Sequence, residues 1–151
     1  MEDTSVQVVP GRLYAPYHNW YGAVASRFFT HLRDNSSIFG NKCQRCQKVF
    51  APPRSVCPDC FSKIEEWIQL PGTGTLAAYT VVHYLYSNNC QPRRPPYVLG
   101  IVRLDGADTG LCHFLDEVGL DQIRIGMRVQ AVFSQERKGK ILDIAYFKPM
   151  G

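Results

Sequence analysis

The second half of the chain alternates short apolar runs with polar turns, which is the pattern of β-strands. The runs are rich in β-branched and aromatic residues and span 73–85, 97–104, 110–115, 127–133 and 141–147. The segment 116–126, between the third and fourth runs, has room for only a short helical turn. Five strands with a small helical element in that place are typical of an OB-type Greek-key barrel. We predict this barrel for residues 71–151, after a linker at 69–72.

The first part of the chain carries a helical pattern instead. Apolar residues recur at steps of four, and a second aromatic row lies beside them. The two rows are Trp20, Val24, Phe28, Leu32 and Tyr17, Tyr21, Ala25, Phe29. Pro16 suits a first helical turn, so we predict an amphipathic helix from Pro16 to about Asp34, within an N-terminal extension of residues 1–37. Two interpretations of its wide aromatic face stay open: packing on the protein's own core, or docking on another subunit.

Between the helix and the strands, four cysteines stand in two Cys-x2-Cys pairs separated by ten residues. They are Cys43, Cys46, Cys57 and Cys60. Zinc prefers four tetrahedral ligands, and each two-residue gap lets one turn present two thiolates to the metal. We predict one structural Zn²⁺ in a rubredoxin-like zinc ribbon at residues 38–70. Four protein ligands leave no open position for catalysis. An iron centre and a degenerate, metal-free ribbon are the alternatives.

Composition and charge narrow the function classes. The chain has 151 residues, of which 45% are hydrophobic and 20% charged, as in a globular protein of one compact domain with a small appendage. No apolar run is long enough to cross a membrane, and the polar N-terminus lacks a secretory signal, so we expect a cytoplasmic protein. The formal charge of +4 falls to about +2 once a zinc tetrathiolate is counted. Such a charge is too small for bulk attraction to nucleic acid or membrane.

The residues that could serve catalysis do not form a set. The spare thiols are Cys90 and Cys112, and the histidines are His18, His31, His83 and His113. Cys112 and His113 are adjacent in a predicted strand, so their side chains point to opposite faces and cannot pair. We expect Cys112 to be buried. With no glycine-rich phosphate loop either, we predict that the chain is not catalytic alone.

Two basic segments are candidates for anion contact. Arg93 and Arg94 stand between prolines and are followed by Tyr97, a combination that suits a phosphorylated ligand. The alternative is a solvated loop stiffened by proline. The segment 137–140 is likewise either a charged hairpin tip or an anion contact.

The order of these motifs resembles a known family. Its elements are Cys-x2-Cys, Pro52-Pro53-Arg54, Cys57-Pro58-Asp59-Cys60, Trp67, Gly72-Thr73-Gly74, Pro96-Tyr97-Val98 and Gly126-Met127-Arg128-Val129. Across about residues 17–147 the chain resembles the zinc-ribbon/OB-fold acyl-CoA-associated proteins, long catalogued as a domain of unknown function. The cysteine block is the most specific part. The sequence departs from the common pattern at Gln47, where a glycine often follows the second cysteine.

The resemblance implies an accessory role. Members are small non-catalytic subunits of thiolase-like enzymes, among them archaeal acetoacetyl-CoA thiolase complexes, steroid side-chain aldolases, a phloroglucinol acetyltransferase and benzoylsuccinyl-CoA thiolase. It implies a hetero-oligomer with a thiolase-like catalytic subunit, and acyl-CoA as the substrate of that complex. It carries the zinc ligands over to the four cysteines, whereas Arg93, Arg94 and Tyr97 remain candidate CoA contacts. A stand-alone acyl-CoA-binding protein and a single-stranded nucleic-acid-binding protein are the competing functions.

Overall fold

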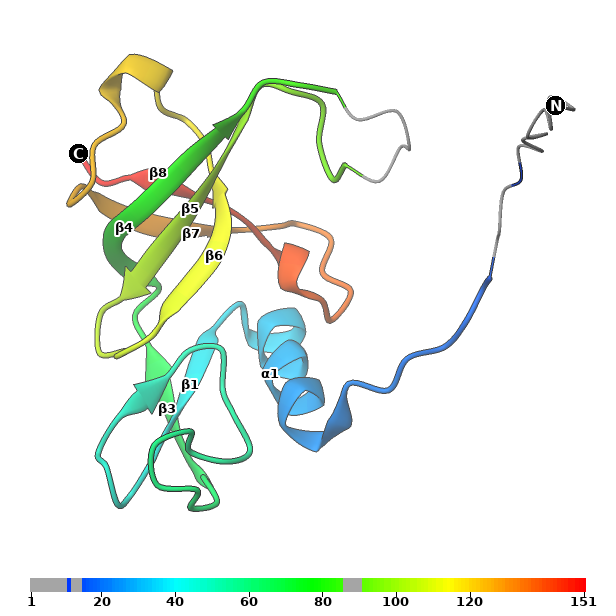
Figure 1. The fold of residues 1–151 in the computed structure, drawn as a ribbon, viewed down its shortest axis with the longest axis vertical. Coiled ribbons are helices and arrows are strands. Elements are labelled where there is room, and N and C mark those ends of the chain that lie inside the picture. Colours follow the sequence, from blue (N-terminus) through cyan, green and yellow to red (C-terminus); the bar gives the residue numbers. More distant parts are fainter. Residues whose placement is uncertain (1–10, 12–14, 86–90) are drawn as a thin grey trace, which may run out of the picture.

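Two β-structures, one small and open and the other closed, follow one another along the chain (Figure 1). The computed structural model describes residue 11 and residues 15–85 and 91–151. A single α-helix, α1 (Gly22–Asn35), precedes the small sheet. That sheet contains β1 (Ile38–Lys42), β2 (Val49–Phe50) and β3 (Glu66–Leu70), all antiparallel in the order β2-β1-β3. We call residues 38–70 the ribbon.

The larger structure is a closed barrel. Its strands are β4 (Thr73–Val82), β5 (Tyr97–Leu104), β6 (Gly110–Leu115), β7 (Arg128–Phe133) and β8 (Ile144–Pro149). They are ordered β4-β5-β6-β8-β7, and the pairing of β4 with β7 closes the barrel. All pairs are antiparallel except β6 with β8. This is the predicted fold class: mainly β, with one helix, a ribbon and a five-stranded OB-type barrel.

Most predicted strand limits are close to the observed ones, and the last strand is the main exception. The predicted short helical element lies at η1 (Leu120–Gln122). The fifth strand was predicted from Ile141 but starts at Ile144, because a second 3₁₀ turn, η2 (Ile141–Asp143), precedes it. The carboxylate of Asp143, fully buried, accepts backbone N–H bonds from Lys138, Gly139 and Lys140. These bonds fold the charged tip at residues 137–140 back onto Asp143, so the strand starts only at Ile144.

The predicted start of the helix is wrong. The helix begins at Gly22 and not at Pro16, and Gly22 itself has a φ of 76°. A right-handed helix cannot continue through that backbone conformation, so the helical path does not extend back through Tyr21. The aromatic residues Tyr17 and Trp20 therefore precede the helix, and both are exposed. The buried residues of α1 are Phe28 and Leu32.

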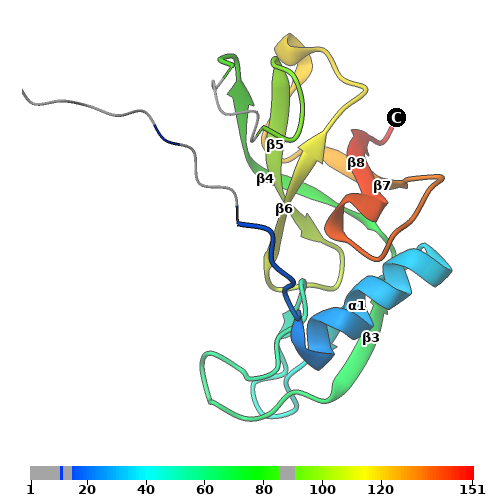
Figure 2. The same ribbon diagram turned by 90° about the vertical axis from the view of Figure 1, so that its right-hand side faces the viewer.

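The helix lies where the ribbon and the barrel meet (Figure 2). One continuous core joins Phe28 and Leu32 of α1 to Ile38 and Leu70 of the ribbon and Leu76 of the barrel. Beyond the helix end, Arg137 Nε donates to the carbonyl oxygen of Arg33 at 2.7 Å. Of the two interpretations of the apolar helix face, packing on the protein's own core holds for these C-terminal turns.

The turn between β5 and β6 clasps the edge of the ribbon. The backbone N–H of Val49 donates to Asp108 Oδ2 at 2.8 Å, and Asp108 N–H donates back to the Val49 carbonyl at 2.9 Å. Ala51 N–H donates to Thr109 Oγ1 at 2.8 Å, and that hydroxyl donates to the Ala51 carbonyl. The linker predicted at 69–72 shrinks to Pro71–Gly72, because Gln69 and Leu70 belong to β3. We call these contacts of Asp108 and Thr109 with β2 the clasp. The clasp and the short linker together hold the ribbon and the barrel in one orientation.

Among the described residues, no helix has the length and the apolar character needed to span a membrane.

Candidate functional site

The four predicted ligands meet at the end of the ribbon. The sulfur atoms of Cys43, Cys46, Cys57 and Cys60 all lie within 4.8 Å of one another. The first cysteine of each pair is buried and the second is partly exposed. Thiolates this close repel one another unless a cation lies between them, and four sulfur donors suit tetrahedral zinc. The cysteines are thus arranged for zinc binding, with all four positions supplied by the chain.

Two equivalent turns position the sulfurs. In the first, Gln47 N–H donates to the Cys43 carbonyl at 2.7 Å, and Cys43 N–H donates to the Lys48 carbonyl at 2.9 Å. In the second, Phe61 and Cys57 repeat the first of these bonds at 2.9 Å. Gln47 and Phe61 have φ values of 60° and 58°, the conformation in which glycine is favoured. The missing glycine at Gln47 therefore does not prevent the turn.

Hydrogen bonds to sulfur bias the protonation of the cluster. Cys46 N–H donates to Cys43 Sγ at 3.4 Å. Hydrogen bonding with Ser62 lowers the pKa of Cys60 to about 6. The hydrogen bond with Cys60 raises the pKa of Cys46 to about 12. Without a cation, Cys46 holds its proton more firmly than Cys60. A metal bound by all four cysteines would require every thiol to be deprotonated.

The ribbon has little apolar core of its own around this cluster. Only Phe50 and Ile64 are buried together with Cys43 and Cys57 in a separate small cluster. A segment with so small a core would gain stability from a metal bound by the four cysteines.

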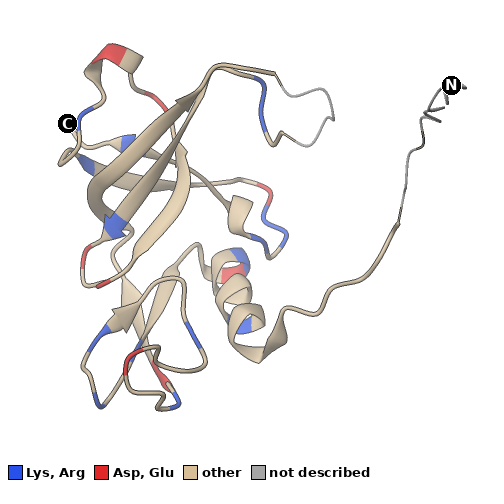
Figure 3. Cartoon of the chain, viewed as in Figure 1, with Lys and Arg blue, Asp and Glu red and all other residues tan. Residues whose placement is uncertain are grey.

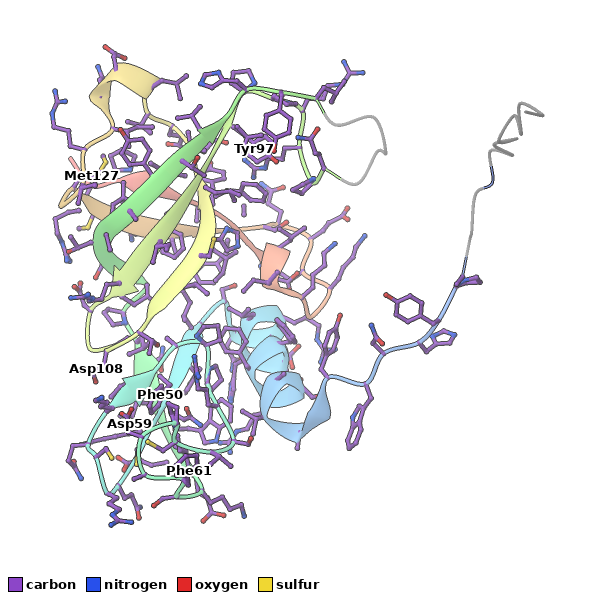
Figure 4. All side chains as sticks on the ribbon, in the orientation of Figure 1. Phe50, Asp59, Phe61, Tyr97, Asp108 and Met127 are labelled. Carbon is purple, nitrogen blue, oxygen red and sulfur yellow. The ribbon has the colours of Figure 1, made fainter. Side chains whose placement is uncertain are left out.

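The three candidate CoA contacts converge on the loop that leads into β5. The Arg93 guanidinium lies 4.1 Å from the centre of the Phe114 ring, and Tyr97 meets the same ring edge-on at 5.8 Å. Arg93 also pairs with Asp116 at 3.0 Å and donates to the Ala145 carbonyl at 2.9 Å. The residues that line a hollow of about 360 Å³ here include Arg93, Arg94, Tyr97 and Asp116. Figure 4 labels Tyr97 beside this loop.

The two arginines of this hollow differ in how they are held. Arg93 is fixed by stacking and by Asp116, which compensates its charge. Arg94 is exposed, and no ion pair or hydrogen bond holds it within the described part of the chain. Arg94 is thus the cation available to a ligand. Cys90, in the same loop, lies outside the described residues.

The predicted burial of Cys112 is wrong. Cys112 is exposed and His113 is 4% exposed, because Leu111, His113 and Leu115 take the inward positions of β6. Strand alternation with those two leucines would have given the right face. The His113 ring is bonded on both sides, to the Ile141 carbonyl and the Phe114 N–H, and burial lowers its pKa. No hydrogen bond joins a thiol to a histidine among the described residues.

A second hollow, of about 270 Å³, was not anticipated from the sequence. It lies on the outer face of β5 and β6 beside Cys112 and Leu142. Its residues come from three separate segments of the chain, so no local motif marks it.

Comparison with known proteins matches both β-structures to one family. Residues 33–66 match the model of the ChsH2 rubredoxin-like zinc ribbon domain, and residues 67–134 match that of the ChsH2 C-terminal OB-fold domain. A DUF35 domain-containing scaffold protein of Methanocaldococcus jannaschii is 30% identical over 82% of this chain and 89% of its own length.

Two further similarities involve named enzymes. The solved structure of an Ltp2-ChsH2(DUF35) aldolase matches with a TM-score of 0.59 and 25% identity, over 82% of this chain and 93% of that one. A probable enoyl-CoA hydratase alpha subunit of Thermomonospora curvata is 33% identical over 58% of this chain but only 26% of its own length. With both domains matched in order and a relative of nearly equal length, the chain belongs to the DUF35 family of zinc-ribbon and OB-fold proteins.

Proposed function

We propose that this protein is a non-catalytic, zinc-binding accessory subunit of a thiolase-type enzyme complex that acts on a β-ketoacyl-CoA. An aromatic substrate such as benzoylsuccinyl-CoA is within the proposal. The names of its relatives support such a role: one is a scaffold protein, one is part of an aldolase, and one is a probable subunit of an enoyl-CoA hydratase. Catalysis would reside in the other chain.

The observation that carries the proposal is an uncharged aromatic segment before the helix. We call residues 15–21 the arm; Tyr17, Trp20 and Tyr21 in it are 75%, 88% and 62% exposed. Figure 3 shows no Lys, Arg, Asp or Glu in the arm, and Figure 4 shows its side chains standing clear of the ribbon and the barrel. Exposed rings without charges are typical of a surface that another protein covers.

In this proposal the zinc has a structural role and takes no part in catalysis. A closed tetrathiolate would hold the ribbon rigid. The ribbon shares a core with α1 and is clasped by the β5–β6 turn. The arm would then leave the body of the protein from a fixed point, which reduces the entropy lost when it docks.

The proposed CoA contacts are Arg94, Arg93 and Tyr97. Arg94 has a free guanidinium beside a hollow that its neighbours line, which suits the phosphates of CoA. The proposal disfavours nucleic acid as the ligand, because single-strand binding needs exposed aromatic faces. On this barrel the face of Phe114 is covered by Arg93, and Tyr97 stands edge-on to it.

Co-expression with a candidate thiolase-like partner tests the proposal. We expect the two chains to co-elute on size-exclusion chromatography, and thiolysis of a β-ketoacyl-CoA to require both. The double substitution Tyr17→Ala and Trp20→Ala should weaken the complex by at least about tenfold. Tyr84→Ala is the matched control, since Tyr84 is 68% exposed outside the arm, and it should leave the affinity unchanged. Chains that elute separately, with thiolysis indifferent to the small protein, would contradict the proposal.

The competing stand-alone function predicts a different outcome. An independent acyl-CoA binder would bind CoA esters in calorimetry without the partner and would not change the partner's thiolysis. A subunit that shares its site would bind CoA esters tightly only in the complex.

A further inference from the structure

The middle of the outer face of β5 and β6 is apolar. Leu99 pairs with Phe114 across the two strands, and Ile101 pairs with Cys112. Directly opposed residues share a face of the sheet. These four side chains alternate with Val98, Val102, Leu111 and Leu115, all of which are buried in the core. The outward row is therefore a second apolar surface on the same strands, and Ile101 within it is 44% exposed.

Part of this surface is hollowed into a site with walls. The hollow of about 270 Å³ is lined by residues of the loop before β5, of the two strands and of η2: Pro92, Leu99, Cys112, His113, Phe114, Ile141 and Leu142. In OB barrels, oligonucleotides and oligosaccharides bind on the face of the second and third strands, between the first and the last connecting loops. The same strands and the same two loops enclose this hollow.

The lining selects for an apolar ligand. Cys112 and His113 are the polar residues of this lining, and both His113 nitrogens are already bonded to backbone groups. No buried side-chain nitrogen or oxygen is left without a partner among the described residues. A polar ligand would lose its hydrogen bonds to water without replacement. A ring or a branched aliphatic group would lose none.

A cationic site adjoins the apolar one. The Arg93 guanidinium stacks on Phe114, so that Arg93 lines the charged hollow and Phe114 lines the apolar hollow. Arg94 stands on the charged side. A ligand that spans both hollows would need an anionic part and an apolar part.

We propose that the hollow on the outer face of β5 and β6 binds the non-polar acyl group of an anionic acyl ester, whose phosphates contact Arg94. This inference rests on the proposed function for the acyl-CoA ligand and adds that the chain itself distinguishes the acyl group. Benzoyl-CoA, CoA and sodium benzoate are the three probes, because a free aromatic acid offers the same apolar chemistry.

Calorimetry on the isolated chain and on the complex measures this discrimination. Burial of one ring predicts that benzoyl-CoA binds at least about tenfold more tightly than CoA. Cys112→Phe fills the hollow and should make the two affinities equal while leaving that for CoA unchanged. Leu142→Asp, at a residue 41% exposed, should do the same without filling the hollow. Ile125→Asp is the control; Ile125 is 67% exposed and lines a different hollow, so the preference should persist.

Alkylation of Cys112 reports occupancy without any substitution. Benzoyl-CoA should slow the reaction of Cys112 with iodoacetamide at least about tenfold, and CoA should not, as followed by mass spectrometry of the Cys112 peptide. Protection by benzoate as well as by benzoyl-CoA would support the site and identify a free acid as a second source of its ligand.

The outcomes separate the two proposals. Equal affinities for benzoyl-CoA and CoA in the unsubstituted protein would overturn the acyl site and leave the accessory function standing. A preference that survives Cys112→Phe would also overturn it. If no probe binds to either the chain or the complex, the acyl site and the CoA contact of the proposed function both fail.

Discussion

The ribbon and the barrel are both small antiparallel structures, yet they are stabilised by different means. The barrel buries residues such as Leu76, Val129 and Phe147 completely. The ribbon's own cluster has only Phe50 and Ile64 beside two of its cysteines. Where little apolar surface is buried, a metal bound by the four converging thiolates would supply the missing stability. The difference suggests that the order of the ribbon, unlike that of the barrel, depends on an ion.

The two regions are nevertheless coupled. The Asp108–Thr109 clasp satisfies backbone groups of β2, and α1 contributes to a core shared by both regions. If the ribbon loses its order, the barrel should therefore become less stable, although it keeps its own strand pairing.

The largest effect is expected from removing one zinc ligand. Cys57→Ser should abolish stoichiometric zinc binding, since structural zinc contributes about 10–16 kcal/mol to comparable small sites. Hydrogen exchange should show an unprotected ribbon and a barrel that is folded but melts at a lower temperature. Cys112→Ser, the matched control at an exposed thiol, should keep its zinc. Unchanged zinc content in Cys57→Ser would refute the metal site.

A smaller effect is expected from opening the clasp. Asp108→Ala removes the acceptor of the Val49 N–H, and Val49 is only 8% exposed. A buried donor left without an acceptor costs about 1–3 kcal/mol. Urea unfolding should show that loss, and exchange at the Val49 amide should accelerate. Asp59→Ala, which removes an exposed ion pair with Lys48, should change stability far less. Equal losses in the two variants would argue against a clasp.

The ion pair between Arg128 and Asp105 predicts that the stability of the protein depends weakly on pH. Hydrogen bonds from Arg128 and Thr73 lower the pKa of Asp105 to about 2. Because the folded-state pKa is lowered, the stabilisation is present above the ordinary aspartate pKa and is lost as the pH falls toward about 2. Both side chains are more than a third exposed, so Asp105→Asn should lower the Tm at pH 7 by less than about 3 °C.

Calorimetry of the unsubstituted protein and of Asp105→Asn at pH 7 and pH 2 isolates the stabilisation that comes from the ionised Asp105. The Tm difference should shrink to a small fraction at pH 2, where the folded-state carboxyl is half protonated, and loss of zinc in acid affects both proteins alike. Glu66→Gln, at an exposed residue, should show no such convergence. A difference that is constant with pH would assign the effect to packing.

The smallest effect concerns the ribbon turns. Gln47 has a φ of 60°, a conformation that disfavours side chains. Gln47→Gly should raise the stability of the zinc-bound protein by up to about 1 kcal/mol, partly offset by the greater freedom of glycine in the unfolded chain. Phe61→Gly tests the second turn in the same way. Urea unfolding in excess zinc measures both. A loss of stability in Gln47→Gly would show that the hydrogen bond from its side chain to the Gln44 carbonyl outweighs the strain.

The sequence by itself determined the features that depend on neighbouring residues. Two Cys-x2-Cys pairs predict two equivalent turns whatever surrounds them, and the strands at 97–104 and 110–115 follow from residue type and short-range alternation. The OB order followed from the number and spacing of those strands. The resemblance to a family rested on the same local motifs.

The tertiary structure alone decided what distant segments do together. Trp20 continues the helical spacing of Phe28, yet only the three-dimensional path showed that the helix starts after it and leaves the ring exposed. Cys112 was assigned to the core because free cysteines are usually buried, whereas the alternation of Leu111 and Leu115 places its side chain on the opposite face. The clasp at Asp108 and the two hollows on either side of Arg93 bring together residues far apart in sequence, so no local pattern contains them.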